Sequence, residues 1–325
     1  MKVKWGVLST ANIAVSCTIP GMQLAENCEL YAIAGRSEDK VNEYKERFGF
    51  EKGYVGYEKL LEDPEVQAVY IPLPNYLHKE WVIKALKAHK NVLCEKPLAI
   101  CAEDAEEMYR TAHENGVILM EAYAYLHSPY IKALKKDIDD GVIGDIVFLD
   151  SAFYTTGYSK DIRLVKEWGG GMIYDLGCYC TTLIQTLVGA EPEEIKATAV
   201  FTDAGVDELA GGVMRFKNGV RAAFDVGMVM GIDTDARFDR TYIHGTKGDI
   251  LSLVPYNAEG KLSYEIRKFD GTTEVRTVDA PQNYSLEAAQ LGRCILDGEK
   301  PYITEEFSIQ NARVLDKLLE SCGYR

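Results

Sequence analysis

Short apolar runs alternate with amphipathic stretches over the first 120 residues of the chain. We expect strands at about 3–8, 28–35, 67–71, 91–94 and 117–120, helices at 38–48, 76–88 and 102–115, and a one-turn segment at 57–61. Strands that alternate with helices are typical of βαβ units. The pattern therefore predicts an α/β fold with an N-terminal Rossmann domain, a doubly wound parallel sheet, over residues 1–122.

The pattern changes after residue 122. Helices are expected at 129–140 and 173–188, and strands at 146–154, 193–203, 208–217, 219–229, 238–244, 248–253 and 262–268. Glycine-containing turns between the later strands favour a large, mostly antiparallel open sheet. We therefore expect an α/β domain for substrate binding and dimerisation over residues 123–325, with two closing helices at 284–296 and 305–321 that could pack back onto the first domain.

Composition and charge narrow the function classes. The 325 residues are 47% apolar and 26% charged, as in an ordinary globular protein, and no apolar run has the length of about 18 residues that a membrane helix needs. Acidic residues outnumber basic ones by 50 to 36, and no segment concentrates Lys and Arg. We therefore do not expect a nucleic acid as a partner. The N-terminal sequence predicts no export signal. Eight scattered cysteines favour free thiols in the cytoplasm and no metal site.

The first turn of the Rossmann domain lacks the usual glycines. Ser9, Ala11 and Ala14 occupy the three positions of the fingerprint, and small side chains still allow a pyrophosphate to approach a helix N-terminus. The candidate phosphate-binding residues are Ser9, Thr10, Ala11, Asn12 and Ile13. A tight turn without a ligand explains this segment equally well.

The end of the second strand carries a basic residue where NAD-binding proteins usually have an acidic one. Arg36 can pair with a 2′-phosphate, and the Ser37 hydroxyl can donate to the same group. This arrangement favours NADP as the cofactor, with NAD as the other option. The alternative is that Arg36 is a solvated residue before a helix that Ser37 caps.

Three further stretches carry a family resemblance. They read Pro72-Leu-Pro-Asn75-Tyr-Leu-His78, Cys94-Glu95-Lys96-Pro97-Leu98 and Gly169-Gly-Gly-Met-Ile-Tyr-Asp175-Leu-Gly-Cys-Tyr179. Together they resemble the Gfo/Idh/MocA oxidoreductases, over nearly the whole chain. Tyr179, where many members carry histidine, and Arg163 look more like the branch of dimeric dihydrodiol dehydrogenases and NADP-dependent D-xylose dehydrogenases.

The residues of these motifs suit alcohol oxidation and carbonyl reduction. Lys96 follows a parallel strand, so its ammonium can reach a ribose hydroxyl and a substrate oxygen. Asp175 and Tyr179 are four residues apart on a predicted helix, so we expect them on one face and directed toward Lys96. Tyr179 is the candidate acid/base for the proton that accompanies hydride transfer, and Asp175 would orient the substrate or Lys96. Without the Glu95-Lys96-Pro97 segment, Tyr179 would be better explained as a core aromatic residue on a buried helix face.

The resemblance implies further contacts. It places Pro72, Leu73, Asn75, Glu95 and Lys96 at the cofactor, His78 at its rim, and Arg163, Trp168 and Tyr123 at the substrate. It also implies a cis peptide bond between Lys96 and Pro97. Leu126 and Ser128-Pro129 depart from the arginine and the His-Pro pair that relatives often carry, so substrate contacts from this strand are expected to differ.

The predicted function is hydride transfer between a nicotinamide cofactor and a hydroxyl or carbonyl of a sugar, polyol or trans-dihydrodiol. A non-catalytic NADP-binding sensor of the same fold is the alternative, whereas Arg36 and Lys96 argue against a methyltransferase. Apolar residues around 213–216 and 222–230 fall on both faces of adjacent strands. We therefore expect a homodimer through the C-terminal sheet.

Overall fold

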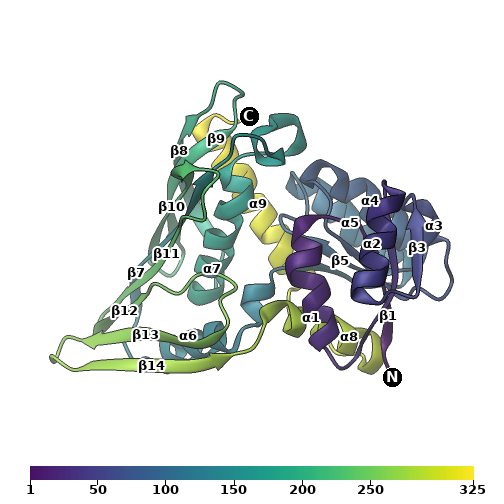
Figure 1. Cartoon of the computed structure of the whole chain (residues 1–325). Helices are drawn as coiled ribbons and strands as arrows, with labels where there is room; N and C mark the ends of the chain where they lie inside the picture. Colours follow the sequence, from purple (N-terminus) through teal and green to yellow (C-terminus); the bar gives the residue numbers. More distant parts are fainter. The chain divides into compact units, whose positions relative to one another are not determined.

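The computed structural model describes residues 1–325, which form two compact units (Figure 1). The first comprises Met1–His127 with Gln282–Ile309, and the second comprises Ser128–Pro281 with Gln310–Arg325. Helix α8 (Asn283–Asp297) therefore belongs with the N-terminal part of the chain, where it packs on α1 (Ile19–Leu24). The sequence allowed for such a return, although the expected division at residue 122 lies slightly earlier than the observed one.

The first unit contains a six-stranded sheet in the order β3-β2-β1-β4-β5-β6. Its strands are β1 (Val3–Leu8), β2 (Cys28–Gly35), β3 (Lys52–Val55), β4 (Ala68–Ile71), β5 (Asn91–Glu95) and β6 (Leu119–Ala122), and every pairing is parallel. Besides α8, the helices are η1 (Ala14–Thr18), α1, α2 (Glu38–Phe48), α3 (Glu58–Leu61), α4 (Asn75–Lys87), α5 (Ala102–Asn115) and η2 (Ala124–His127). The predicted Rossmann fold is confirmed, and its order reverses direction between β1 and β4.

Most of the strands predicted from the sequence are buried, because a buried strand carries a run of apolar residues. All four residues of β4 are buried, and β1 buries Trp5, Val7 and Leu8 completely. The strand β3 was not expected because its four residues alternate between half-buried and exposed at the edge of the sheet. An edge strand has one unpaired side and little apolar content, so its pattern resembles that of a loop.

The second unit contains an eight-stranded sheet in the order β14-β13-β12-β11-β7-β10-β9-β8. Its strands are β7 (Ile146–Gly157), β8 (Pro192–Phe201), β9 (Asp207–Phe216), β10 (Arg221–Ile232), β11 (Arg237–Gly245), β12 (Gly248–Ser252), β13 (Gly260–Lys268) and β14 (Thr273–Ala280). All pairings are antiparallel except that of β7 with β10. The mostly antiparallel sheet is confirmed, but the exposed edge strand β14 was not predicted.

Two helices cover one face of this sheet. Helix α7 (Cys178–Val188) packs on β7 and β10, and α6 (Pro129–Asp139) contacts β14 and α7 (Figure 1). The last helix, α9 (Glu305–Cys322), begins in the first unit and ends in the second. None of the helices combines the length and the apolar character that crossing a membrane requires.

Candidate active site

Lys96 lies at the carboxyl end of a central strand. It follows β5 directly and is partly exposed, whereas Glu95 and Pro97 on either side are buried. The Lys96–Pro97 peptide bond is cis, which confirms the expectation from the motif. Leu98 N–H donates to Glu121 Oε1 at 2.8 Å, so the turn after the lysine is bonded to β6. Ligands of open α/β sheets bind at this edge.

A buried polar network lies behind the lysine. Tyr70 OH donates to Glu95 Oε1 at 2.5 Å and accepts from Thr18 Oγ1 at 2.9 Å. Burial and the neighbouring Glu95 raise the pKa of Tyr70 well above its ordinary value, so the phenol stays protonated and keeps donating. The carboxyl of Glu287 on α8 is also fully buried, and burial raises its pKa. Glu95 is thus oriented by the protein and is not displayed to solvent.

His78 lies beneath the loops at this edge. It is fully buried on α4, with Nδ1 at 2.9 Å from the Pro97 carbonyl oxygen and Nε2 at 2.7 Å from that of Leu73. Burial lowers the pKa of His78, whereas the carbonyl oxygens of Leu73 and Pro97 oppose this change. A neutral imidazole carries one N–H and donates to one of these two carbonyls. The residue therefore ties the loop after β4 to the lysine turn. Pro72 and Leu73 in that loop are buried, and Asn75 is half-buried at the start of α4.

The predicted phosphate turn opens directly into a helix. Ser9, Thr10 and Ala11 follow β1 and are partly exposed, and helical geometry begins at Asn12 and Ile13. Val15 N–H donates to the Ala11 carbonyl at 3.2 Å. A Cβ on Gly35 would lie 3.1 Å from Thr10 Cγ2, so the end of β2 approaches this turn closely. The small side chains and the free helix N-terminus suit an anionic group.

Arg36 is exposed at the end of β2 and forms no ion pair. Burial raises the pKa of the Tyr57 phenol. Arg36 and Ser9 lie near this phenol and oppose the rise. Ser37, also exposed, accepts a long hydrogen bond of 3.5 Å from Lys40 N–H as the N-cap of α2. An arginine without an acidic partner beside a helix N-terminus fits the phosphate groups of NADP. The residues of the first unit therefore suit a nicotinamide dinucleotide.

In the second unit, the glycine run leads into the helix that carries Asp175 and Tyr179. A π-helical segment, η5 (Ile173–Gly177), continues into α7, which confirms the predicted helix. Between 171 and 180, Asp175 and Tyr179 are half-buried and all other residues are buried. Both residues therefore lie on the accessible side of this helix, as their spacing predicts.

A buried carboxyl group that was not predicted from the sequence holds the start of this helix. Asp207, at the start of β9, accepts from Ile173 N–H at 2.6 Å. Gly171 has a φ of +103°, and a Cβ there would overlap Asp207 Oδ1. Glycine is thus required both by the backbone and by the close approach of the acid. Burial raises the pKa of Asp207 to about 7, and the backbone N–H groups oppose this rise.

Arg163 and Asp175 form an ion pair within the second unit. Arg163 Nε donates to Asp175 Oδ2 at 2.6 Å, and Arg163 Nη1 donates to Asp161 Oδ1 at 3.0 Å. The charge of Asp175 raises the pKa of the guanidinium further above its ordinary range. Two predicted site residues are therefore in direct contact. Asp175 is held as a carboxylate in a fixed orientation.

An aromatic cluster surrounds Tyr179. Its ring centroid is 5.6 Å from that of Phe153 on β7 and 5.2 Å from that of Tyr256, and Phe153 stacks on Tyr256 at 5.2 Å. Arg237 lies 4.4 Å over the Phe153 ring and forms two 2.7 Å hydrogen bonds with the buried Asp239. These partners were not predicted from the sequence, because they come from β7, β11 and the loop after β12, which are distant from Tyr179 along the chain.

The other two predicted substrate residues differ in exposure. Trp168 is 39% exposed beside the glycine run, whereas Tyr123 is fully buried and packs edge-on against Tyr125. The Trp168 side chain is therefore accessible to a ligand, whereas Tyr123 contributes to the core of the first unit.

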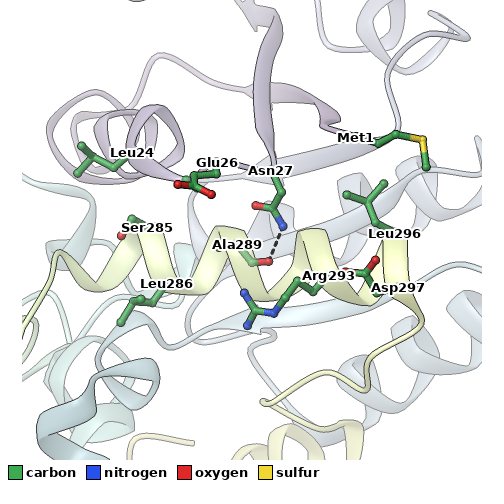
Figure 2. A pocket seen from close by; sticks show the side chains of 11 residues that line it. Met1, Leu24, Glu26, Asn27, Ser285, Leu286, Ala289, Arg293, Leu296 and Asp297 are labelled. Carbon is green, nitrogen blue, oxygen red and sulfur yellow. Dashed lines mark hydrogen bonds between the residues drawn. The ribbon is translucent and has the colours of Figure 1, made fainter.

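A pocket of about 460 Å³ in the first unit lies at the opposite edge of its sheet. Figure 2 shows Met1 and Asn27, which precede β1 and β2, beside Arg293 and Leu296 of α8, with Asn27 Nδ2 donating to the Ala289 carbonyl at 2.9 Å. Amino ends of parallel strands are not where these folds bind their cofactors. The structure also contains no group of three or more acidic, cysteine or histidine residues arranged to hold a metal ion.

Comparison with known proteins agrees with this organisation. Residues 3–123 match the family model described as oxidoreductase family, NAD-binding Rossmann fold, and residues 131–251 match the GFO/IDH/MocA C-terminal domain. The D-xylose 1-dehydrogenase (NADP⁺) 2 of Haloferax volcanii is 31% identical over 322 residues, covering 98% of this chain and 96% of that protein. The trans-1,2-dihydrobenzene-1,2-diol dehydrogenase of Xenopus laevis is 30% identical, covering 99% of each chain.

A solved structure shows the same similarity. The 3-ketoreductase KijD10 of Actinomadura kijaniata, in complex with NADP and TDP-benzene, superposes with a TM-score of 0.93 at 29% identity and covers 99% of this chain and 98% of its own. The fold and these matches thus define an NAD(P)-dependent oxidoreductase. The chain belongs to the Gfo/Idh/MocA family.

Proposed function

We propose that the protein transfers a hydride between NADP(H) and a hydroxyl or carbonyl carbon of a sugar, polyol or trans-dihydrodiol. The observation that carries this proposal is the partly exposed Lys96 at the carboxyl end of β5, in a turn bonded to buried groups on both sides. When bound, the nicotinamide accepts or supplies the hydride. The side chains of the chain must then polarise the substrate oxygen and move its proton.

Lys96 and Tyr179 serve these two tasks in the proposal. The Lys96 ammonium polarises the reacting oxygen and stabilises negative charge on it. Tyr179, half-buried in its aromatic cluster, gives a proton to the oxygen in reduction and removes it in oxidation. Asp175, fixed by Arg163, accepts hydrogen bonds from neighbouring substrate hydroxyls. A sensor that binds cofactor without turnover would not need this set of groups.

Arg36 is proposed to read the 2′-phosphate of NADP. Its guanidinium is exposed and unpaired at the end of β2. The xylose dehydrogenase relative uses NADP⁺ by name, and the KijD10 structure contains NADP. These features support a preference for NADP, with NAD as the weaker cofactor. The segment 9–13 and the loop residues Pro72, Leu73 and Asn75 complete the proposed binding surface.

The proposed substrate has a ring with several hydroxyl groups. Named relatives act on D-xylose and on a dihydrobenzene diol, which share a ring with neighbouring oxygens. Aromatic rings such as Phe153 and Tyr256 suit the apolar face of such a ring, while Arg163 and Asp175 suit its hydroxyls. The exposed Trp168 is proposed to contact the same ligand.

The face of the large sheet that α6 and α7 leave uncovered is the proposed homodimer interface. Val213 is 57% exposed and Phe238 is 39% exposed, and the strand register places both on the same face of the sheet. Arg240 bridges Asp150 at 2.5 Å and Asp225 at 3.5 Å on adjacent strands, so the face mixes apolar and paired polar groups. Analytical ultracentrifugation should report two chains per particle, and Val213→Asp should shift the species toward one. A single chain at micromolar concentration would contradict the dimer.

The eight cysteines are all free, which supports the proposed location in the reducing cytoplasm. The enzymatic proposal is tested with purified protein, NADP or NAD, and a panel of aldoses, cyclic polyols and trans-diols. Formation of NADPH with at least one class supports it. Tight NADPH binding without turnover on any member, in either direction, favours the sensor instead.

A further inference from the structure

The turn that carries Lys96 is fixed by two buried side chains. His78 contacts the carbonyl of Pro97, and Glu121 accepts from the N–H of Leu98 at 2.8 Å. Glu121 lies on β6, next to β5, and is only 2% exposed. It contacts the turn with an ionisable group, although a neutral amide would satisfy the same N–H. A fully buried carboxyl group costs stability unless it has a role or strong partners.

We propose that Glu121 is a positioning residue for Lys96, which holds the turn after the lysine and supplies a carboxyl charge that orients its ammonium. This inference rests on the catalytic role proposed for Lys96. Glu121 itself touches neither substrate nor cofactor in this account. Its effect reaches the reaction through the conformation and electrostatic environment of the lysine.

Electrostatics support the geometry. Burial raises the pKa of Glu121 to about 7, while the Ser308 hydroxyl, the Leu98 N–H, the Tyr123 hydroxyl and, least, the Lys96 charge oppose the rise. The other titratable groups facing Glu121 are Tyr109 on α5 and Cys94 on β5. Burial raises the pKa of both, so these two groups stay neutral while Glu121 titrates. The carboxyl can therefore change charge near neutral pH, and Lys96 is among the groups that influence this change.

The ionised form is the one that attracts the ammonium and accepts the stronger bond from Leu98. Below its pKa, Glu121 is a neutral acid that still accepts the N–H but no longer attracts the lysine. Turnover should therefore fall as the pH drops through about 7. The change reflects the loss of one charge interaction with Lys96, for which about a tenfold effect on kcat is expected.

Glu121→Gln tests the proposal because the amide keeps the shape and the acceptor but cannot ionise. Above a pH of about 7, we expect kcat of this variant to lie about tenfold below the wild-type value, and at low pH the two values should be equal. The fall of kcat with decreasing pH, the acidic limb of the pH profile, should be absent from the variant. Glu287→Gln is the matched control, since Glu287 is equally buried but has no bond to the turn. This control should keep the limb. An unchanged limb in Glu121→Gln would overturn the proposal.

Two additional variants keep the outcome decisive. If Glu121→Gln does not fold, Glu121→Asp replaces it as the test, because it withdraws the carboxyl by one methylene. If the acidic limb of the kcat–pH profile lies at the same pH in Glu121→Asp as in the wild type, the proposal is contradicted. Lys96→Ala separates this inference from the proposed function. If Lys96→Ala retains full turnover, the lysine role itself is wrong. If it is inactive while Glu121→Gln behaves as wild type, only the positioning role is wrong.

Discussion

The lysine turn of the first unit and the Asp175 helix of the second are held in a similar way. In each, a buried carboxyl group from another strand accepts a backbone N–H, Glu121 from Leu98 and Asp207 from Ile173. The two segments differ in the contacts that their candidate functional side chains make. Asp175 is already paired with Arg163, and Tyr179 lies in an aromatic cluster, whereas Lys96 emerges from the end of a parallel strand.

This difference indicates a division of tasks. The parallel sheet places the residues that follow its strands at one edge by topology alone. The second unit gathers side chains from the antiparallel sheet and its loops, where single changes alter the contacts to a ligand. We therefore expect substitutions in the first unit to affect polarisation of the reacting oxygen and cofactor binding. Substitutions in the second unit should affect proton transfer and substrate binding.

The largest expected effect comes from Lys96→Met, which keeps an unbranched side chain one heavy atom shorter but removes its charge. We expect kcat/KM to fall by about 10³- to 10⁴-fold because the reacting oxygen loses its cationic partner. Steady-state formation of NADPH measures this effect. Lys87→Met, at an exposed position of α4, is the control and should remain active. A loss below about tenfold would place the catalytic charge elsewhere.

Asp207→Asn should change the pH dependence of stability. The wild-type carboxyl has its pKa raised from 3.8 to about 7 in the folded state, so the native protein retains a proton that the unfolded chain loses. Stability therefore falls as the pH rises through this window, by up to about 4 kcal/mol, and the Asn variant escapes this loss.

Urea unfolding at several pH values measures the difference between wild type and Asp207→Asn. The neighbouring half-buried Glu208 offers the control Glu208→Gln, whose curve should run parallel to the wild type. A parallel curve for Asp207→Asn as well would show that Asp207 is ionised throughout, and its role as a buried acid would be wrong.

Tyr179→Phe keeps the aromatic cluster and removes the proton-transferring hydroxyl. We expect kcat to fall by about 10²-fold while cofactor binding is unchanged, because only the acid/base is lost. NADPH fluorescence titration measures the binding. Tyr174→Phe, a buried tyrosine on the same helix, should retain activity. Equal activity of the two variants would assign Tyr179 to the core.

The smallest effect is expected from Arg36→Ala. Loss of a charge-assisted phosphate contact should reduce the ratio of kcat/KM for NADP to that for NAD by about tenfold. Arg47→Ala, an exposed arginine on α2, should leave the ratio unchanged. If both variants keep the wild-type ratio, Arg36 is a solvated residue before the N-cap Ser37.

Each unit was predicted from the sequence in part. Strands buried on both faces and the motif around Lys96 are local signals, and the cis peptide bond and the helix with Asp175 and Tyr179 were confirmed. The edge strands β3 and β14 were missed because exposed strands lack a clear apolar alternation.

The remaining site contacts depend on distant pairings. Tyr256 joins Tyr179 from 77 positions further along the chain, and Asp207 meets the glycine run from the start of β9. No local pattern marks either residue. The closest signal was Gly171, whose requirement for glycine is explained by Asp207.

The central claim is that Lys96 supports hydride transfer to or from NADP(H) on a hydroxylated ring. The most direct test compares wild type with Lys96→Met on the best substrate of the panel, following nicotinamide absorbance and, separately, NADPH binding. The account predicts turnover by the wild type and loss of about 10³-fold or more in a variant that still folds. Comparable turnover by both proteins would contradict it.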